Sequence, residues 1–143
     1  MKVRIKRFDT TLPLPEYKTK GAAGFDLSVR ITTTIAPHTV GYVPLNVVIE
    51  PPEGHYVALV ARSSLHKRGL MPANGFGVGD RDYSGNEDEY KAALLNFTDK
   101  DVVVERGERI MQVVISPVVH VEFLEVEDMG NDNRGGFGTT GNN

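Results

Sequence analysis

The chain has 143 residues, of which 40% are hydrophobic and 24% are charged, a size and balance typical of one globular domain. It contains no cysteine, which excludes disulfides and thiolate metal sites, and its net charge of −3 argues against a general nucleic-acid-binding surface. Neither a signal peptide nor an apolar run of the roughly 20 residues that cross a bilayer is present, so we expect a soluble, intracellular, cytoplasmic protein without membrane contacts.

Short runs of apolar residues, mostly with a period of two, predict β-strands along the chain. In chain order they cover residues 1–6, 40–43, 47–49, 56–60, 92–95, 102–104, 110–115 and 118–126. Gly, Pro, Asn and Asp separate the runs, and this spacing favours an antiparallel barrel or sandwich. One short helix is expected at residues 63–68, with a serine capping its start and Gly69 ending it.

The last residues have a different composition. Residues 128–143 are rich in Gly, Asn and Thr, and Met129 and Phe137 are their only large apolar side chains. Such a segment has too little apolar surface to pack by itself, so we expect it to be mobile until a ligand binds. The predicted organisation is one domain over residues 1–127, with residues 128–143 as its flexible lid.

Two segments in the first half of the chain contain candidate binding residues. Residues 22–27 place Asp26 among apolar neighbours behind small residues, although a turn into a strand with a solvated Asp would look the same. Arg62, Ser63 and Ser64 stand where a strand ends and the short helix begins. Backbone N–H groups, a guanidinium and two hydroxyls suit a phosphate, and the alternative is a capped helix with a surface arginine.

The glycine-rich residues 74–85 have the composition of a hairpin that a planar ligand can approach closely, Gly77 being one of its glycines. The Asn74 amide offers a donor and an acceptor, as the imide edge of uracil does. Asp80 has the chemistry to take a proton from a water, and Tyr83 can pack on a sugar. The alternative is a hairpin with solvated carboxylates.

Two later segments add polar groups. Arg109 and Gln112 interrupt an apolar strand and need partners there, either a ligand or a neighbouring chain. Residues 133–141 set Phe137 and Gly138 before two threonines, a pattern that can close over a base and reach its phosphates. This segment is not a Walker A loop, and a disordered tail is the alternative.

Together and in this order, the five segments resemble the five motifs of the trimeric dUTPase family, over residues 22–141. The resemblance implies a jelly-roll-like β-barrel that assembles as a homotrimer with shared active sites. It also implies Mg²⁺-dependent hydrolysis of dUTP to dUMP and pyrophosphate, which limits uracil in DNA and supplies dUMP for dTMP synthesis.

The resemblance also implies roles for single residues. Asp80 would orient and deprotonate the water that attacks the α-phosphorus, and Tyr83 would pack on the deoxyribose and exclude a 2′-hydroxyl. Asn74 and the hairpin backbone, including Gly77, would bind uracil. The phosphates would be bound by Arg62, Ser63, Ser64 and Gln112. Phe137 would stack on uracil, and the nucleotide would be contacted by Gly138, Thr139 and Thr140. Asp26 would contact Mg²⁺ through water.

Three departures from the family pattern are visible. Gly79 stands where the family commonly has Ile, which is expected to loosen the hairpin. Residues 87–89, Glu-Asp-Glu, lengthen a loop that we expect to be solvated, because three adjacent carboxylates cannot all face one ion. The family's tail arginine is replaced by Asp132, and Arg134 is expected to take its role.

Three other functions were weighed against dUTP hydrolysis. A dCTP deaminase of the same fold relies on a hairpin Glu and lacks the Asp-x-Asp-Tyr arrangement followed by this tail. A nucleotide-sensing binding module would be expected to lose Asp80 or the lid. A generic all-β carbohydrate or peptide binder would explain the strands but not the polar segments.

Overall fold

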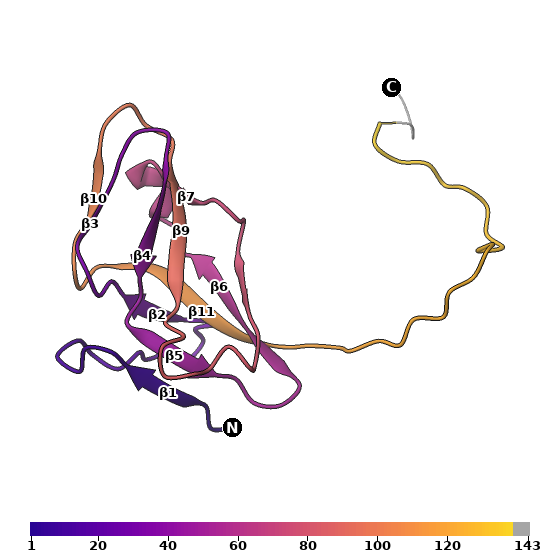
Figure 1. Cartoon of the computed structure of the whole chain (residues 1–143), viewed down its shortest axis with the longest axis horizontal. Coiled ribbons are helices and arrows are strands. Elements are labelled where there is room, and N and C mark those ends of the chain that lie inside the picture. Colours follow the sequence, from indigo (N-terminus) through magenta and orange to yellow (C-terminus); the bar gives the residue numbers. More distant parts are fainter. Residues whose placement is uncertain (139–143) are drawn as a thin grey trace.

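Antiparallel strands joined by tight turns make up nearly all the regular structure of the chain (Figure 1). The computed structural model describes residues 1–138. The strands are β1 (Arg4–Arg7), β2 (Phe25–Ser28), β3 (Thr33–Ile35), β4 (Val40–Pro44), β5 (Val47–Glu50), β6 (His55–Ala61), β7 (Leu70–Pro72), β8 (Gly77–Gly79), β9 (Lys91–Asn96), β10 (Val102–Val104) and β11 (Arg109–Pro117). The all-β, jelly-roll-like prediction is therefore confirmed.

Four small sheets surround one core. The largest has the order β2-β11-β6-β8, a second has the order β4-β9-β7, and β1 pairs with β5 as β10 does with β3. Alternate residues point inward, so that in β9 Ala92, Leu94 and Asn96 are buried while the residues between them face outward. The fully buried side chains include Leu27, Ile35, Val43, Leu45, Ile49, Val57, Leu70 and Val104. Burial of aliphatic side chains from every sheet stabilises the barrel.

The predicted helix is a single 3₁₀ turn, η1 (Leu65–Arg68). Gly69 ends it with φ of 77°, in the left-handed region, as predicted. The serine cap was wrong, because Ser64 makes no side-chain capping hydrogen bond. Among residues 1–138 this turn is the only helix, so none there is long and apolar enough to cross a membrane.

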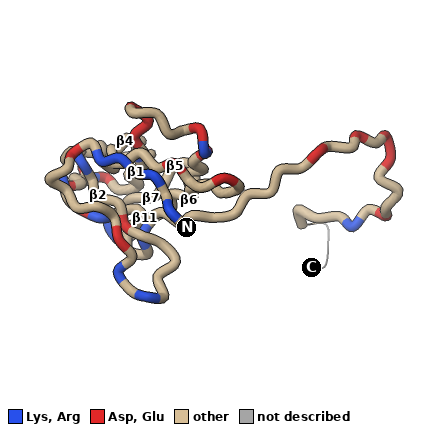
Figure 2. Tube along the Cα trace, turned by 90° about the horizontal axis from the view of Figure 1, so that it is seen from below, with Lys and Arg blue, Asp and Glu red and all other residues tan. Residues whose placement is uncertain are grey.

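The strand predicted at residues 118–126 is absent from the described structure. After β11 the chain leaves the barrel as an extended tail (Figure 1), along which Asp and Glu outnumber Lys and Arg (Figure 2). Val119, Phe123 and Leu124 in the tail are more than four-fifths exposed. The alternating pattern is there, but a strand also needs a partner with free backbone groups, and the tail has none within its own barrel.

Other strand boundaries differ less. β1 begins at Arg4 rather than at the first residue, and β2, β3, β7 and β8 were not among the predicted runs. These strands have only three or four residues, too few for an alternating pattern to be recognised.

Candidate functional site

The hairpin that carries β8 forms one wall of a pocket of about 340 Å³. β8 pairs with β6, with Gly77 opposite Leu59 and Gly79 opposite Val57. The residues lining the pocket are Tyr42, Leu59, Asn74, Gly77, Val78, Gly79, Tyr83, Glu89, Tyr90, Lys91 and Ala93. The structure thus brings together Asn74, Gly77 and Tyr83, three of the residues predicted to hold the nucleoside.

Tyr83 is fixed at this pocket by two contacts. Its hydroxyl donates a 3.0 Å hydrogen bond to the Glu89 carbonyl, and its ring meets the Tyr90 ring edge to face, with centroids 5.6 Å apart. Burial raises the pKa of Tyr83, and it raises the pKa of Tyr90 to about 12. Both phenols therefore stay protonated at neutral pH, and Tyr83 offers a neutral ring surface to a ligand.

Tyr90 corrects the prediction that Gly79 loosens the hairpin. A Cβ atom at position 79 would lie 2.0 Å from the Tyr90 hydroxyl oxygen, so the phenol occupies the space that a side chain would need. The Tyr90 side chain is buried, and its hydroxyl has no hydrogen-bond partner within the described part of the chain. The hairpin is therefore close-packed at Gly79, because a residue distant in sequence fills the space beside it.

The proposed base, Asp80, follows β8 directly and is exposed. It borders a groove of about 710 Å³ that is lined by Glu53, Gly54, His55, Tyr56, Val78, Asp80, Arg81, Asp82, Val118 and His120. Val78 lines both this groove and the hairpin pocket, so the carboxylate stands beside the pocket rather than in it. A solvent-facing carboxylate at this border can hold a water next to a ligand that fills the pocket.

A second group of predicted residues meets at the other end of β6. Asp26 and Gln112 are opposite each other on β2 and β11, and the Asp26 carboxylate lies 3.2 Å from Nε of Arg62 and 3.9 Å from Nη1 of Arg109. The Gln112 amide donates a 3.2 Å hydrogen bond to the carbonyl of Ala61. The partners required for the polar residues of this strand are therefore in place within the protomer.

Arg62 and Ser64 also line a cleft of about 510 Å³. Lys67, Arg68 and Arg109 share it, and Glu108 pairs with Arg68. Because η1 is one short turn, the cations rather than a helix dipole supply the positive potential. Lys67 and Arg68 were not among the residues predicted for the site. Ser63 is exposed beside this cleft.

The two groups are far apart in one protomer. Gly79 pairs with Val57 near the start of β6, whereas Arg62 follows its last residue, Ala61. At about 3.3 Å per strand residue, the five steps from Val57 to Arg62 amount to roughly 16 Å. A base acts on a water within hydrogen-bond reach, about 3 Å. Within one protomer, Asp80 and Arg62 are therefore attached to the barrel at well-separated points.

One residue of the acidic loop 87–89 is not solvated as predicted. Glu89 is 4% exposed rather than solvated, and its carboxylate accepts two 2.7 Å hydrogen bonds from the Arg30 guanidinium and one of 2.9 Å from the backbone N–H of Asn46. Glu87 is exposed, as expected. Glu89 directly precedes Tyr90 in the chain. Its fixed carboxylate therefore helps to hold one wall of the hairpin pocket in place.

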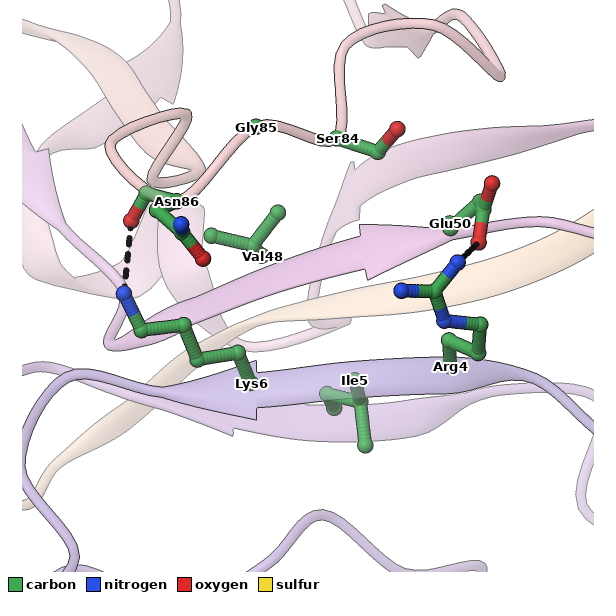
Figure 3. A pocket seen from close by; sticks show the side chains of 8 residues that line it. All are labelled: Arg4, Ile5, Lys6, Val48, Glu50, Ser84, Gly85 and Asn86. Atoms are coloured by element: carbon green, nitrogen blue, oxygen red, sulfur yellow. Dashed lines mark hydrogen bonds and ion pairs between the residues drawn. The ribbon is translucent and has the colours of Figure 1, made fainter.

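A smaller pocket of about 110 Å³ lies under the loop that follows Tyr83 (Figure 3). Arg4 there lies 2.8 Å from Glu50, and the Lys6 ammonium donates a hydrogen bond to the Asn86 carbonyl. Figure 3 shows these two contacts on opposite sides of the pocket. The first joins β1 to β5, and the second attaches the loop to β1.

The tail residues are not near either group. Arg134, Phe137 and Gly138 are exposed at the end of the described chain, and among the described residues the Arg134 side chain hydrogen-bonds only to the neighbouring Gly135 carbonyl. Thr139 and Thr140 lie outside the described residues.

The donor set for a metal is sparse. Within residues 1–138 no three His, Asp or Glu side chains are placed to hold an ion together. Asp26 is paired with arginines, and one such carboxylate suits a contact through water rather than direct coordination. Mg²⁺ keeps several of its waters and binds through substrate phosphates in many enzymes, so these residues fit an ion that arrives with a nucleotide.

Comparison with known proteins gives one family. The dUTPase family model matches residues 10–141. The deoxyuridine 5′-triphosphate nucleotidohydrolase from Hydrogenobaculum sp. (strain Y04AAS1) is 41% identical to this chain, and the match covers 99% of both chains. The deoxyuridine 5′-triphosphate nucleotidohydrolase from Rhizobium rhizogenes (strain K84) is 42% identical, over 91% of this chain and 86% of the relative.

Solved structures agree with this result. The dUTPase from Streptococcus mutans superposes with a TM-score of 0.75 at 35% identity, over 83% of this chain and 98% of that one. The dUTPase of Staphylococcus bacteriophage 80alpha, a G164S mutant with dUpNHpp, gives a TM-score of 0.84 over 98% of both chains. At 22% identity the second match bears on the fold alone.

Proposed function

Because the chain belongs to the dUTPase family, we propose that it hydrolyses dUTP to dUMP and pyrophosphate with the residues of the two groups described above. The observation that carries the proposal is the hairpin pocket, in which Asn74, Gly77 and Tyr83 converge next to the Asp80 carboxylate. The reaction would limit uracil in DNA by removing dUTP, and it would supply dUMP for dTMP synthesis.

Recognition of the base is assigned to the hairpin. The Asn74 amide pairs a donor and an acceptor with the imide edge of uracil, and Gly77 lets the backbone approach the ring. Polar readout of this kind can reject a wrong base by up to about 10⁴–10⁵-fold, because the mismatched base leaves buried groups unpaired. Tyr83 packs on the deoxyribose and leaves no room for a 2′-hydroxyl.

The chemical step uses Asp80. Its carboxylate orients a water and takes its proton as the water attacks the α-phosphorus, and pyrophosphate leaves from the opposite side. A carboxylate is a weak base at neutral pH, so much of the rate enhancement comes from holding the water and the phosphorus in line.

Arg62, on the other side of the proposed site, would balance charge on the phosphates, and Ser63, Ser64 and Gln112 would donate hydrogen bonds to them. Guanidinium groups bind phosphate oxygens through paired, charge-assisted hydrogen bonds. Mg²⁺ bound with the nucleotide would offset charge on the triphosphate and on the leaving group. Asp26, already oriented by Arg62, would contact that ion through its waters.

We further propose a homotrimer in which neighbouring copies complete each site. The separation of Asp80 from Arg62 along β6 supports this, since a neighbouring copy can place its own phosphate-binding side chains beside Asp80. Exposed apolar residues of the tail also support the homotrimer, among them Val119, Phe123 and Leu124. An extended segment with apolar side chains and no partner in its own barrel is suited to pairing with another copy.

Residues 128–143 are proposed to act as the lid over bound nucleotide. Phe137 would stack on uracil, Gly138 would let the backbone approach the nucleotide, and Arg134, Thr139 and Thr140 would reach its phosphates. Closure excludes water and adds donors where negative charge develops. The exposure of Phe137 outside the barrel supports such a role, since an aromatic side chain there is free to meet a ligand.

Turnover of dUTP with pyrophosphate detection tests the proposal. Asp80→Asn keeps the shape and removes the base, so kcat should fall at least about 100-fold, the size of a general-base contribution. Asp101→Asn, a change at an exposed carboxylate outside the site, is the matched control and should keep the wild-type rate. A loss of only a few-fold in Asp80→Asn would move the chemistry elsewhere, and ammonia release from dCTP without dUTP turnover would indicate a deaminase.

A further inference from the structure

Gly79 and Tyr90 form a matched pair beneath the hairpin pocket. The Tyr90 phenol fills the volume that any side chain at position 79 would need, and its side chain is 5% exposed. Val57 and Leu59 of β6 face the same side of the sheet as Gly79 and Gly77, so the ring is enclosed by strands. Tyr90 therefore cannot shift without opening the core.

The same ring supports Tyr83. The two rings meet at 90° with centroids 5.6 Å apart, and the Tyr83 hydroxyl is held by the carbonyl of Glu89, the residue next to Tyr90. Glu89 is in turn fixed by Arg30 and by the backbone of Asn46. A continuous set of contacts thus runs from the core to the exposed face of Tyr83.

We propose that Tyr90 is a specificity-determining positioning residue that sets how far Tyr83 projects into the nucleoside pocket, and so controls the preference for deoxyribose over ribose. The inference rests on the proposed function, in which Tyr83 packs on the sugar. A ring that is backed by a buried neighbour cannot recede, so a 2′-hydroxyl meets a fixed surface. Without that neighbour, Tyr83 can move back and admit the extra oxygen.

The effect is expected in the ratio of kcat/KM for dUTP to kcat/KM for UTP. Tyr90→Val removes the ring that backs Tyr83, and the ratio should fall roughly three- to tenfold, the worth of one aromatic pair. Tyr90→Phe keeps the ring and removes only the unpartnered hydroxyl, so its ratio should stay at the wild-type value. Tyr90→Leu keeps more buried volume, and serves if the valine variant does not fold.

A core truncation outside the site separates selectivity from stability. Val104 is fully buried on β10, which pairs with β3 and does not border the hairpin pocket. Val104→Ala should lower stability and affect both substrates equally, leaving the ratio unchanged. A merely structural role for Tyr90 would give the same result in Tyr90→Val and Tyr90→Leu.

The outcomes are distinct. If wild type hydrolyses dUTP but the ratio in Tyr90→Val and Tyr90→Leu equals that of wild type, or if Tyr90→Phe loses selectivity as fully as they do, the inference about the ring is wrong while the proposed function stands. If wild type turns over neither nucleotide, the proposed function itself fails. A fall of the ratio confined to the variants without the ring supports the inference.

Discussion

Asn74 and Tyr83 line the hairpin pocket, and the Asp80 carboxylate borders the adjoining groove. The chemistry of each of these side chains suggests a role. Tyr90 was missed because its role depends on the absence of a side chain at Gly79, which is eleven residues away in the sequence but in contact in space. Glu89 was missed because the residues beside it suggested a solvated loop.

Arg134 is the cation that we expect to approach the phosphates from the tail. Arg134→Ala should lower kcat at least about tenfold, because a charge-assisted contact that strengthens as charge develops on the phosphates would be lost. Steady-state turnover of dUTP measures this fall in kcat. Because among the described residues the Arg134 side chain hydrogen-bonds only to the neighbouring Gly135 carbonyl, the melting temperature should not change, and an unchanged rate would remove Arg134 from the site.

Among the elements, two turns are joined by Asp9. Its carboxylate accepts hydrogen bonds from the side chain and backbone N–H of Thr11 and lies 2.7 Å from Nη2 of Arg106, on the turn before β11. The hydrogen bond from the Thr11 hydroxyl, followed by that from Arg106, holds the pKa of Asp9 well below its ordinary value of 3.8. The ionised carboxylate thus stabilises the folded chain.

The pKa of Asp9 predicts a dependence of stability on pH. A carboxyl group whose pKa is lower in the folded state contributes stability above its unfolded value, and that contribution is lost as pH falls toward the folded value. Asp9→Asn should therefore lower the urea midpoint at pH 7, and the difference from wild type should shrink below about pH 3.8. Glu127→Gln in the exposed tail is the control; a difference that is the same at all pH values would exclude ionisation of Asp9 as its cause.

The strands themselves were largely predictable, and the exceptions have physical reasons. Alternating apolar residues gave most of the strands of the barrel, because one face of each is buried. Residues 118–126 have the same alternation but no partner in the barrel, and the sequence does not show where a partner is. The helix cap failed because Ser64 has helical backbone angles (φ −103°, ψ −2°) rather than the extended ones of an N-cap, and because the N–H of Lys67 already bonds to the Ser64 carbonyl.

At the scale of the whole molecule, the two groups of proposed site residues lie at different places on the barrel. Asp80 and Arg62 lie near opposite ends of β6, and the chain between Val118 and Gly138 extends away from its own barrel (Figure 1). Sequence motifs pointed to the residues around Asp80 and to those around Arg62, but they could not show that the two groups are separated. The distance between the groups is set by the pairing of β8 with β6. Closed assemblies of identical chains can bring the two halves together at each interface.

Co-expression of two inactive variants tests most directly whether the base and the phosphate-binding side chains come from different copies. Asp80→Asn and Arg62→Ala chains with different affinity tags are purified as mixed assemblies and assayed with dUTP. In a trimer that holds both variants, one of the three sites combines an intact Asp80 with an intact Arg62 from its neighbour, so the purified mixed assemblies should recover about a third of the wild-type rate. A mixed assembly no more active than the two variants assayed separately would contradict the shared site.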